Sequence, residues 1–505
     1  MNQLKAGAVL NYVAIILNMV IGLLYTPYML RMLGQAEYGL YSLAASIIAY
    51  LTVLDLGFGN AIIRYTAKFR AEGKIDEQKY MFGMFLVLYI GIGIIAVIAG
   101  AVLSLNVESI FSAKMTEYEV DRTRIMLWLM TFNLAFTFPM SIWGSIMTAY
   151  ERFTFPRIVS IVRSVLNPLV MVALLAIGYK ALAMVIVTTI FNVVTLLINY
   201  WYCKNKLKIE VRYGKFDFKF LKEVSVYSFW IFLNAIMDKI YWSTGQFVLG
   251  IYRGTVAIAI YAVAIHLQNM FMMFSTAITG VFLPKVTAMV AKGDNEKDIS
   301  DLFIRTGRIQ YILLSLILTG FIIFGRSFIN LWAGEGYQEA YLYALMFFIP
   351  LTVPLIQNMG IIILQARNQM KFRSLLYIVI AVVSLVSSFP LAKYYGGMGC
   401  AISTAGALVL GQIIIMNIYY QRKQHINIIR FWKEISNMSL VPIAFISIYL
   451  VFQAEIDIYT TSFMNFTIGI VAFLSLYVPL FWKLSMNRSE KELFMQPVLK
   501  VLKRN

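Results

Sequence analysis

Long apolar segments follow one another along the whole chain, and short polar segments separate them. A helix needs about 20 mostly apolar residues to cross a bilayer, and most of these segments reach that length. Lipid cannot satisfy an open backbone, and a membrane barrel would show alternating segments of about ten residues, so we expect helices. The pattern predicts about 14 transmembrane helices, at residues 8–33, 38–64, 80–105, 124–148, 156–178, 181–203, 223–250, 256–283, 307–325, 339–365, 374–392, 399–420, 437–454 and 463–483.

The composition agrees with this pattern. Hydrophobic residues make up 60% of the 505 residues and charged residues 13%, whereas soluble domains average about 45–50% and about 25%. A net charge of +18 would suggest nucleic acid in a soluble protein, but here the basic residues lie in short clusters between apolar segments. We therefore expect an all-α polytopic membrane protein that lies in the lipid bilayer and does not bind nucleic acid.

The basic clusters also predict the topology. They follow the even-numbered helices, as at 68–79, 204–222 and 422–433, while the alternate loops are short and poor in Lys and Arg. Under the positive-inside rule both termini are then cytoplasmic, in a bacterial cytoplasmic (inner) membrane. The first apolar segment lacks a cleavage pattern, so it is expected to be a retained span.

Motifs of the common enzyme classes are missing from the sequence. It contains no GxxxxGK[ST] phosphate loop, no HExxH and no GxSxG. Cys203 and Cys400 lack the spacing of metal ligands. We expect no enzymatic activity, no cofactor and no metal site, and a protein that works through its helices.

A weak internal repeat suggests two related halves. At an offset of about 216 residues, Leu-Asn at 17–18 matches Leu-Asn at 233–234, and Leu-Gly at 33–34 matches Leu-Gly at 249–250. Parallel repeats around a cavity are a transporter arrangement. We expect two six-helix bundles in a pseudo-twofold arrangement around a polar cavity, plus two C-terminal helices, with the boundaries 1–203 (N-terminal bundle), 204–222 (basic cytoplasmic linker), 223–420 (C-terminal bundle) and 421–505 (two extra helices and a basic cytoplasmic tail).

The seventh predicted helix carries charge at its centre. Asp238 and Lys239 lie mid-span, and Asn234 and Asp238 share a face at i, i+4. An ionised group at mid-bilayer costs about 2.5–3.5 kcal/mol on insertion scales, so it faces protein or water. An interior ion pair and a cavity-lining role are both open, and the cavity is favoured.

Helices two and five carry further polar groups. Asp55 precedes Gly57 and Gly59, which weaken the helix and allow a bend, and Asn60 and Arg64 share a face beyond them. For Arg64, a side chain that extends to the lipid headgroups is nearly as good an explanation as a side chain that lines a cavity. Arg163 and Asn167 share a face of the fifth helix, where a cavity is favoured.

Two other helices carry basic or helix-breaking residues. A structural explanation is favoured for the ninth, and a gate and a static kink are both open for the tenth. Arg305 and Arg308 open the ninth helix, where anchoring at the membrane interface is favoured. Pro350 and Pro354 predict a kink in the tenth helix, because each removes a backbone hydrogen bond.

These groups suggest what the cavity binds. Cations outnumber acids, and guanidinium groups bind phosphate well, while amides suit sugar hydroxyls. The predicted substrate-binding residues are Arg64, Arg163, Lys239, Asn60, Asn167 and Asn234. Asp55 and Asp238 are predicted to carry a coupled proton (H+) or Na+.

The N-terminal motifs resemble a known family. They are Leu33-Gly34-x-x-x-Tyr38-Gly39-Leu40-Tyr41-Ser42-Leu43, Leu54-Asp55-Leu56-Gly57 and Asn60-x-x-x-Arg64-Tyr65. They resemble the O-antigen and capsule repeat-unit (Wzx-type) flippases of the multidrug/oligosaccharidyl-lipid/polysaccharide exporter superfamily, whose six-plus-six-plus-two plan also matches the predicted helices.

The resemblance implies a flippase for polysaccharide biosynthesis, including that of O-antigen in lipopolysaccharide. It implies translocation of an undecaprenyl-pyrophosphate-linked (polyprenyl-pyrophosphate-linked) oligosaccharide from the inner to the outer leaflet by alternating access, with other polysaccharide-assembly membrane proteins as candidate partners. A peptidoglycan-precursor flippase and a cation-coupled multidrug exporter of the same superfamily stay open as alternatives. A membrane glycan polymerase is disfavoured, because the predicted outer loops are short and free of histidine.

Overall fold

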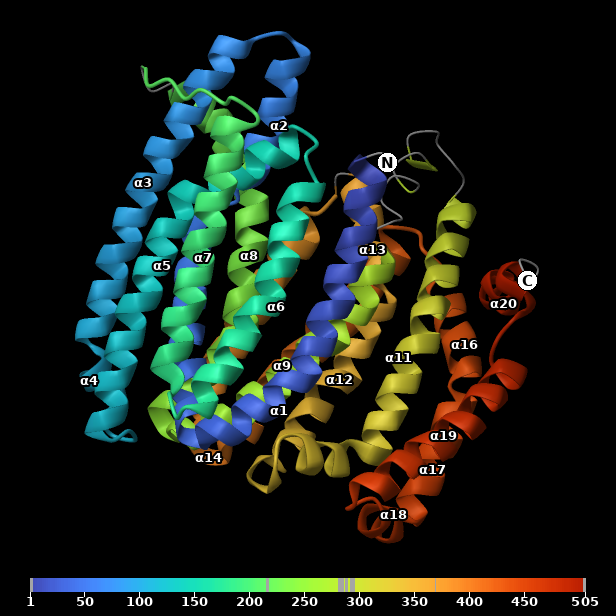
Figure 1. Ribbon diagram of the computed structural model, residues 1–505. Helices are drawn as coiled ribbons and strands as arrows, with labels where there is room; N and C mark the ends of the chain where they lie inside the picture. The colour runs from blue at the N-terminus through green and yellow to red at the C-terminus, as the bar shows by residue number, and fades with distance from the viewer. Residues whose placement is uncertain are drawn as a thin grey trace. The chain divides into compact units, whose positions relative to one another are not determined.

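The computed structural model describes residues 3–214, 218–279, 286, 289–290, 296–367 and 369–502. Within these ranges every regular element is a helix (Figure 1). Nine described helices are long and apolar enough to cross a membrane, or up to 11 if each of two bent pairs forms one span. Two of the nine, Leu10–Ala71 and Lys371–Arg422, run for 62 and 52 residues, which is more than one crossing needs. The all-α polytopic prediction is confirmed, and the count of 14 stays a prediction.

The chain divides into two compact units. Unit 1 comprises Met1–Ala262 and Tyr377–Ser403, and unit 2 comprises Val263–Leu376 and Thr404–Asn505. The first unit contains α1 (Gln3–Leu51), η1 (Thr52–Asp55), α2 (Phe58–Ala71), α3 (Ile75–Leu105), α4 (Val107–Phe111), α5 (Glu117–Ala149), α6 (Thr154–Ala176), α7 (Ala181–Asn205), α8 (Phe218–Tyr252), the start of α9 (Thr255–Thr279) and most of α14 (Lys371–Leu408).

The second unit holds the remaining helices. They are the rest of α9, α11 (Glu296–Trp332), η2 (Glu335–Tyr337), α12 (Ala340–Ile356), α13 (Asn358–Ala366), the ends of α14, η3 (Val409–Ile415), α15 (Met416–Arg422), α16 (Ile428–Met438), α17 (Leu440–Val451), α18 (Gln453–Tyr459), α19 (Phe463–Leu484) and α20 (Arg488–Leu502). This grouping differs from the expected halves, because α8, expected to open the second half, packs against α1 and α2 in unit 1. The boundaries at 203, 223 and 420 stay a prediction about the repeat.

Backbone breaks fall where the sequence predicts them. The long helix α1 is kinked at Gly34, with φ 73°, and α14 is kinked at Gly396, with φ 59°. Both positions lie in gaps between predicted spans. The helix that includes α1 and α2 is interrupted at Leu56 and Gly57, which have φ 54° and 72°. The left-handed region is open to Gly and rarely used by other residues, so Gly57 makes this predicted bend possible.

The hydrophobic core of unit 1 is built around α3. The helices α3, α5 and α7 run side by side (Figure 1), and α5 packs against both of the others. Phe58 of α2 and Phe85 of α3 are buried there with their ring centroids 5.8 Å apart. Burial of such large apolar side chains between helices fixes α2, α3 and α5 to one another, since close packing is what joins helices in lipid.

The N-terminal motif has a packing role in unit 1. Gly39 lies against the start of α9, and a Cβ atom at this position would overlap the carbonyl of Thr255. Leu40 and Leu43 are fully buried. The small residue thus allows a close approach of two backbones, which is the use of glycine between membrane helices.

The basic segment after α7 is attached to α3. The backbone amide of Arg212 donates to the carbonyl of Lys79 over 3.1 Å, and Lys79 Nζ lies 2.6 Å from Glu210 Oε2. The hydrogen bond from Lys79 lowers the pKa of Glu210. The part of the predicted 204–222 linker that precedes residue 215 is therefore a docked segment.

In unit 2, α11 is the central helix. It packs against α12, α17 and α19. The helix pair α12 and α13 is bent by 41° at Gln357, three residues after Pro354. The kink predicted from Pro350 and Pro354 is confirmed.

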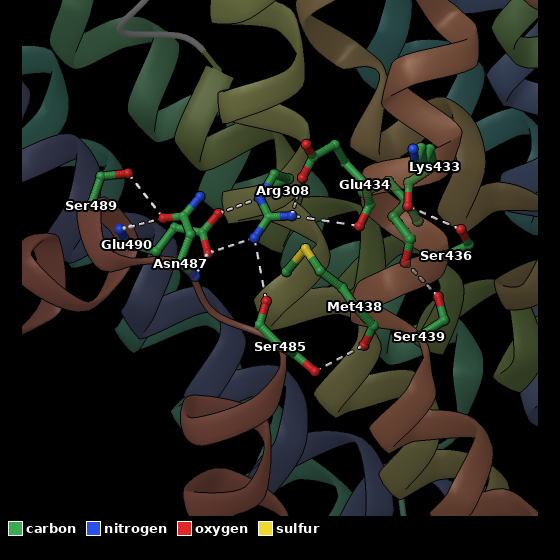
Figure 2. Close-up of polar contacts among 11 residues, drawn as sticks. Arg308, Lys433, Glu434, Ser436, Met438, Ser439, Ser485, Asn487, Ser489 and Glu490 are labelled. Atoms are coloured by element: carbon green, nitrogen blue, oxygen red, sulfur yellow. Dashed lines mark hydrogen bonds and ion pairs between the residues drawn. The ribbon is translucent and has the colours of Figure 1, made fainter.

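A buried ion cluster ties the C-terminal helices to α11 (Figure 2). Arg308 is 6% exposed, and its Nε lies 2.6 Å from Glu490 Oε1 of α20 while its Nη1 lies 2.8 Å from Glu434 Oε2 of α16. Its Nη2 also donates to the carbonyl of Ser485 over 3.3 Å. Interfacial anchoring was the wrong expectation for Arg308, because two acids distant in sequence surround it. Arg305, one turn earlier, is exposed.

Candidate functional site

A cavity of about 280 Å³ with a mixed polar and apolar wall lies within unit 1. Its wall comes from α1, η1, α5, α7 and α8, and consists of Tyr41, Ala45, Ile48, Ala49, Thr52, Met130, Asn133, Leu134, Thr137, Val185, Thr188, Thr189 and Lys239. Hydroxyl and amide groups thus alternate with aliphatic side chains. The helix break after α1 contributes to this wall, since it places Thr52 in η1 instead of in a continuous helix.

Lys239 supplies the one positive charge among the described residues that line this cavity. It is half-buried, and it makes no ion pair with any carboxylate that the structure describes. Burial of a charge without a partner is unfavourable. An ammonium group without an ion pair among the described residues, half-buried in this cavity, is therefore suited to an anionic ligand.

Arg163 is connected to the same cavity through a chain of hydrogen bonds. Arg163 Nη1 donates to Asn192 Oδ1 over 2.9 Å. The Nδ2 atom of Asn192 donates in turn to Asn133 Oδ1 and to Thr137 Oγ1, each over 2.8 Å. Since Asn133 and Thr137 line the cavity, Arg163 orients its wall without being a lining residue itself.

Asn192, Asn133 and Thr137 were missed in the sequence. Asn133 and Thr137 lie four residues apart in an apolar helix, so they share a face. That spacing is the signal that could have found the pair. Asn192 carries no such signal, because one amide in an apolar span is compatible with many environments, and only the structure shows its three partners.

Three other predicted binding residues, Asn60, Arg64 and Asn167, do not line this cavity. Asn60 and Arg64 are exposed on α2, where the Arg64 guanidinium lies over the Tyr65 ring at 5.7 Å from its centroid. Asn167 is half-buried on α6, and its Oδ1 atom is buried without a hydrogen bond to any described group. The side chain of Asn234 lies outside the described residues. Their roles in binding stay predictions.

The two candidate ion-coupling acids, Asp55 and Asp238, are not among the described residues that line the Lys239 cavity. Asp55 is the last residue of η1 and is half-buried. Asp238 is exposed on α8, and its Oδ1 atom accepts a hydrogen bond from the Tyr377 hydroxyl over 2.8 Å. Tyr377 belongs to α14, so this bond joins two helices that are distant in sequence.

Apolar spanning helices around a small cavity, whose wall holds hydroxyl groups, an amide and a cation without an ion pair among the described residues, are typical of helical membrane transporters. The chain belongs to the polysaccharide biosynthesis protein family, whose family model matches residues 4–290, more than half of its length. The sequence-based identification of a polysaccharide-exporter relative is thereby confirmed at the level of the family.

Individual relatives agree with the family. The chain is 21% identical over 412 residues to the "Putative O-antigen transporter" of Shigella flexneri, a match that covers 78% of this chain and 92% of the relative.

Solved structures share the fold. The Lipid II flippase MurJ, in an inward closed conformation, matches with a TM-score of 0.71 at 15% identity, over 94% of this chain and 98% of MurJ. The MATE multidrug transporter DinF-BH matches with a TM-score of 0.61 at 16% identity, over 83% of this chain and 96% of the transporter. At such identities the likeness shows the fold alone.

Proposed function

We propose that this protein is a flippase that moves undecaprenyl-pyrophosphate-linked oligosaccharide repeat units from the inner to the outer leaflet of the bacterial cytoplasmic membrane. The proposed process is alternating access in O-antigen or capsule biosynthesis, without enzymatic chemistry on the substrate. The observation that carries the proposal is Lys239, an ammonium group without a described partner in a polar cavity of a polysaccharide biosynthesis family member. The name of the Shigella flexneri relative supports the choice of substrate.

The cavity suggests a division of roles. Lys239 would bind a pyrophosphate oxygen by charge-assisted hydrogen bonding, which is stronger than a neutral hydrogen bond. Asn133 and Thr137, oriented through Asn192 by Arg163, would bind sugar hydroxyls. The lipid tail would stay in the bilayer, because its transfer into a polar cavity has no favourable contribution.

The remaining predicted residues complete the proposal. Asn60, Arg64, Asn167 and Asn234 would contact the substrate at other stages of transport. Asp55 and Asp238 would carry a coupled proton or Na+. The hydrogen bond from Tyr377 to Asp238 supports such a role for Asp238, since an ion or proton on the carboxylate would compete with that bond and alter the contact between α8 and α14.

The test is deletion of the gene followed by extraction of the membrane lipids. The proposal predicts that polyprenyl-linked repeat units accumulate on the cytoplasmic side and that the surface polysaccharide is lost. Unchanged polysaccharide with raised sensitivity to cationic dyes would instead support a multidrug exporter. Accumulation of peptidoglycan precursors would support the alternative flippase.

A further inference from the structure

A second cavity, of about 640 Å³, lies at the other end of the α6–α7 hairpin from the docked 207–214 segment. It belongs entirely to unit 1 and is distinct from the Lys239 cavity. Two basic side chains, Arg122 of α5 and Lys180 before α7, line it together with Tyr118, Tyr179 and Glu37. In the topology predicted from the basic loops, this end faces away from the cytoplasm.

The two cations share one aromatic ring. The Arg122 guanidinium lies 5.1 Å from the centroid of the Tyr118 ring, and Lys180 Nζ lies 5.9 Å from the same centroid. Cation–π contacts of this kind hold a charged group in place and leave its hydrogen-bond donors available. Arg122 forms no ion pair with the carboxylates that the structure describes, whereas Arg124, two residues away, pairs with Glu108 and Asp121.

The acid in the cavity is already engaged. Glu37 is 7% exposed; its Oε1 atom accepts a hydrogen bond from the Tyr118 hydroxyl over 2.8 Å, and its Oε2 atom accepts one from the backbone amide of Ala181 over 3.2 Å. Lys180 Nζ is 3.8 Å from Glu37 Oε1. One carboxylate therefore faces two cations, and the cavity keeps a net positive charge.

The N-terminus of a helix also lies at this cavity, where the backbone amide of Ala181 already donates to Glu37 Oε2. The first residues of α7, which is 25 residues long, form part of the cavity wall. The N-terminus of a helix carries a partial positive charge that favours anions. Helix ends are also the level at which lipid phosphates lie.

We propose that this cavity is a phosphate-binding site, in which Arg122 and Lys180 hold a phosphate group at the membrane surface. The phosphate belongs to an anionic phospholipid headgroup of the adjoining leaflet or to a soluble pyrophosphate. Arg122 would bind two phosphate oxygens with its planar donor pair, and Lys180 would bind as a point charge. The site does not depend on the flippase proposal, since none of its residues line the Lys239 cavity.

The experiment compares R122Q and K180Q with R124Q in the full-length purified protein. R124Q removes the same charge two residues away on α5, from a side chain that already pairs with acids. Native mass spectrometry measures the binding of phosphatidylglycerol, and calorimetry measures the binding of inorganic pyrophosphate. A hydrogen bond to a charged group contributes about 1.5–3 kcal/mol, so R122Q is expected to weaken binding of the occupying phosphate about tenfold or more.

The two binding measurements identify the source of the phosphate. Loss of phosphatidylglycerol binding alone assigns the site to a lipid headgroup, and loss of pyrophosphate binding alone assigns it to a soluble phosphate. K239Q separates this site from the transport cavity, because pyrophosphate binding that K239Q removes and R122Q spares belongs to the latter. K180Q, at an exposed side chain, keeps the test valid if R122Q fails to fold. Binding of both probes at wild-type strength in R122Q and K180Q would overturn the proposal.

Discussion

Asn192 is the residue whose position says most about how the Lys239 cavity is built. Its amide connects Arg163, outside the cavity, with Asn133 and Thr137 in the wall. Each group in the chain satisfies a polar neighbour inside an apolar helix bundle, where an unsatisfied group is unfavourable. The network therefore fixes the orientation of the Asn133 amide in the cavity wall.

Replacement of Asn192 by Ala is expected to lower both stability and transport. It removes the hydrogen bonds that Arg163 and Asn133 make with Asn192, and an unpaired buried polar group costs about 1–3 kcal/mol. A double-mutant cycle with N133A, read out as the free energy of unfolding in a detergent titration, should give a coupling of about 0.5–1 kcal/mol or more between the two sites. Additive effects of N192A and N133A would show that the hydrogen bond between Asn192 and Asn133 does not contribute to the free energy of unfolding.

Sequence reasoning found the charges of this region and missed their connections. Lys239 and Arg163 stand out because ionisable groups are rare within spanning helices. Asn192 does not stand out, because neither its neighbours nor its spacing distinguish it from an amide in a packed helix interface. Arg308 shows the same limit: its acids, Glu434 and Glu490, lie more than a hundred residues away in sequence, so only the folded chain brings them together.

At the scale of whole elements, single side chains decide which helices stay together. Arg308 joins α11 to α16 and α20. Both Arg308 and Glu490 are almost fully buried, and removal of one partner from a buried pair leaves the other uncompensated.

R308Q is therefore expected to destabilise unit 2 by about 3–5 kcal/mol, the usual effect of breaking a buried ion pair. Limited proteolysis should then release the segment that contains α20 faster than in the wild type. The matched control is R305Q, one turn earlier on the same helix and exposed, which should cleave at the wild-type rate. Equal protection of α20 in R308Q and R305Q would contradict the role of the cluster.

A substitution at Gly39 tests the close approach of α1 and α9. G39A places a methyl group on the Thr255 carbonyl, and a forced shift in a packed interface costs about 1–3 kcal/mol. G144A is the control, because Gly144 has no neighbour within 4 Å of a Cβ position, and Ala there should be neutral or stabilising by up to about 1 kcal/mol. Thermal unfolding measures both, and equal unfolding temperatures would refute the packing role.

The positions of backbone breaks were the most predictable part of the fold. The kinks at Gly34 and Gly396 and the bend after Pro354 fall where turn-forming or helix-breaking residues interrupt an apolar run. Assignment of helices to compact units was less predictable. Any apolar helix can pack against any other, so the sequence of α8 does not predict that this helix packs against α1 and α2.

For the whole molecule, the basic loops predict which ends of the helices face the cytoplasm. The two natural cysteines, Cys203 and Cys400, are both buried, so a single cysteine introduced at an exposed site can be labelled without removing them. A cysteine at Ser112 should react with an impermeant maleimide in intact cells, and one at Lys206 should react only after lysis. The reverse pattern would invert the proposed topology.

The central claim, that Lys239 binds the anionic part of a lipid-linked oligosaccharide during its translocation, is tested most directly in proteoliposomes. A labelled polyprenyl-pyrophosphate oligosaccharide is placed in one leaflet, and its appearance in the other is followed with an impermeant reagent. K204Q is the control, since Lys204 is exposed and donates to Tyr200 at the end of α7. The wild type and K204Q should translocate the substrate, and K239Q should do so about tenfold more slowly, as expected for loss of one charge-assisted hydrogen bond. Equal rates in K239Q and K204Q, or a wild-type rate no higher than that of protein-free liposomes, would contradict the account.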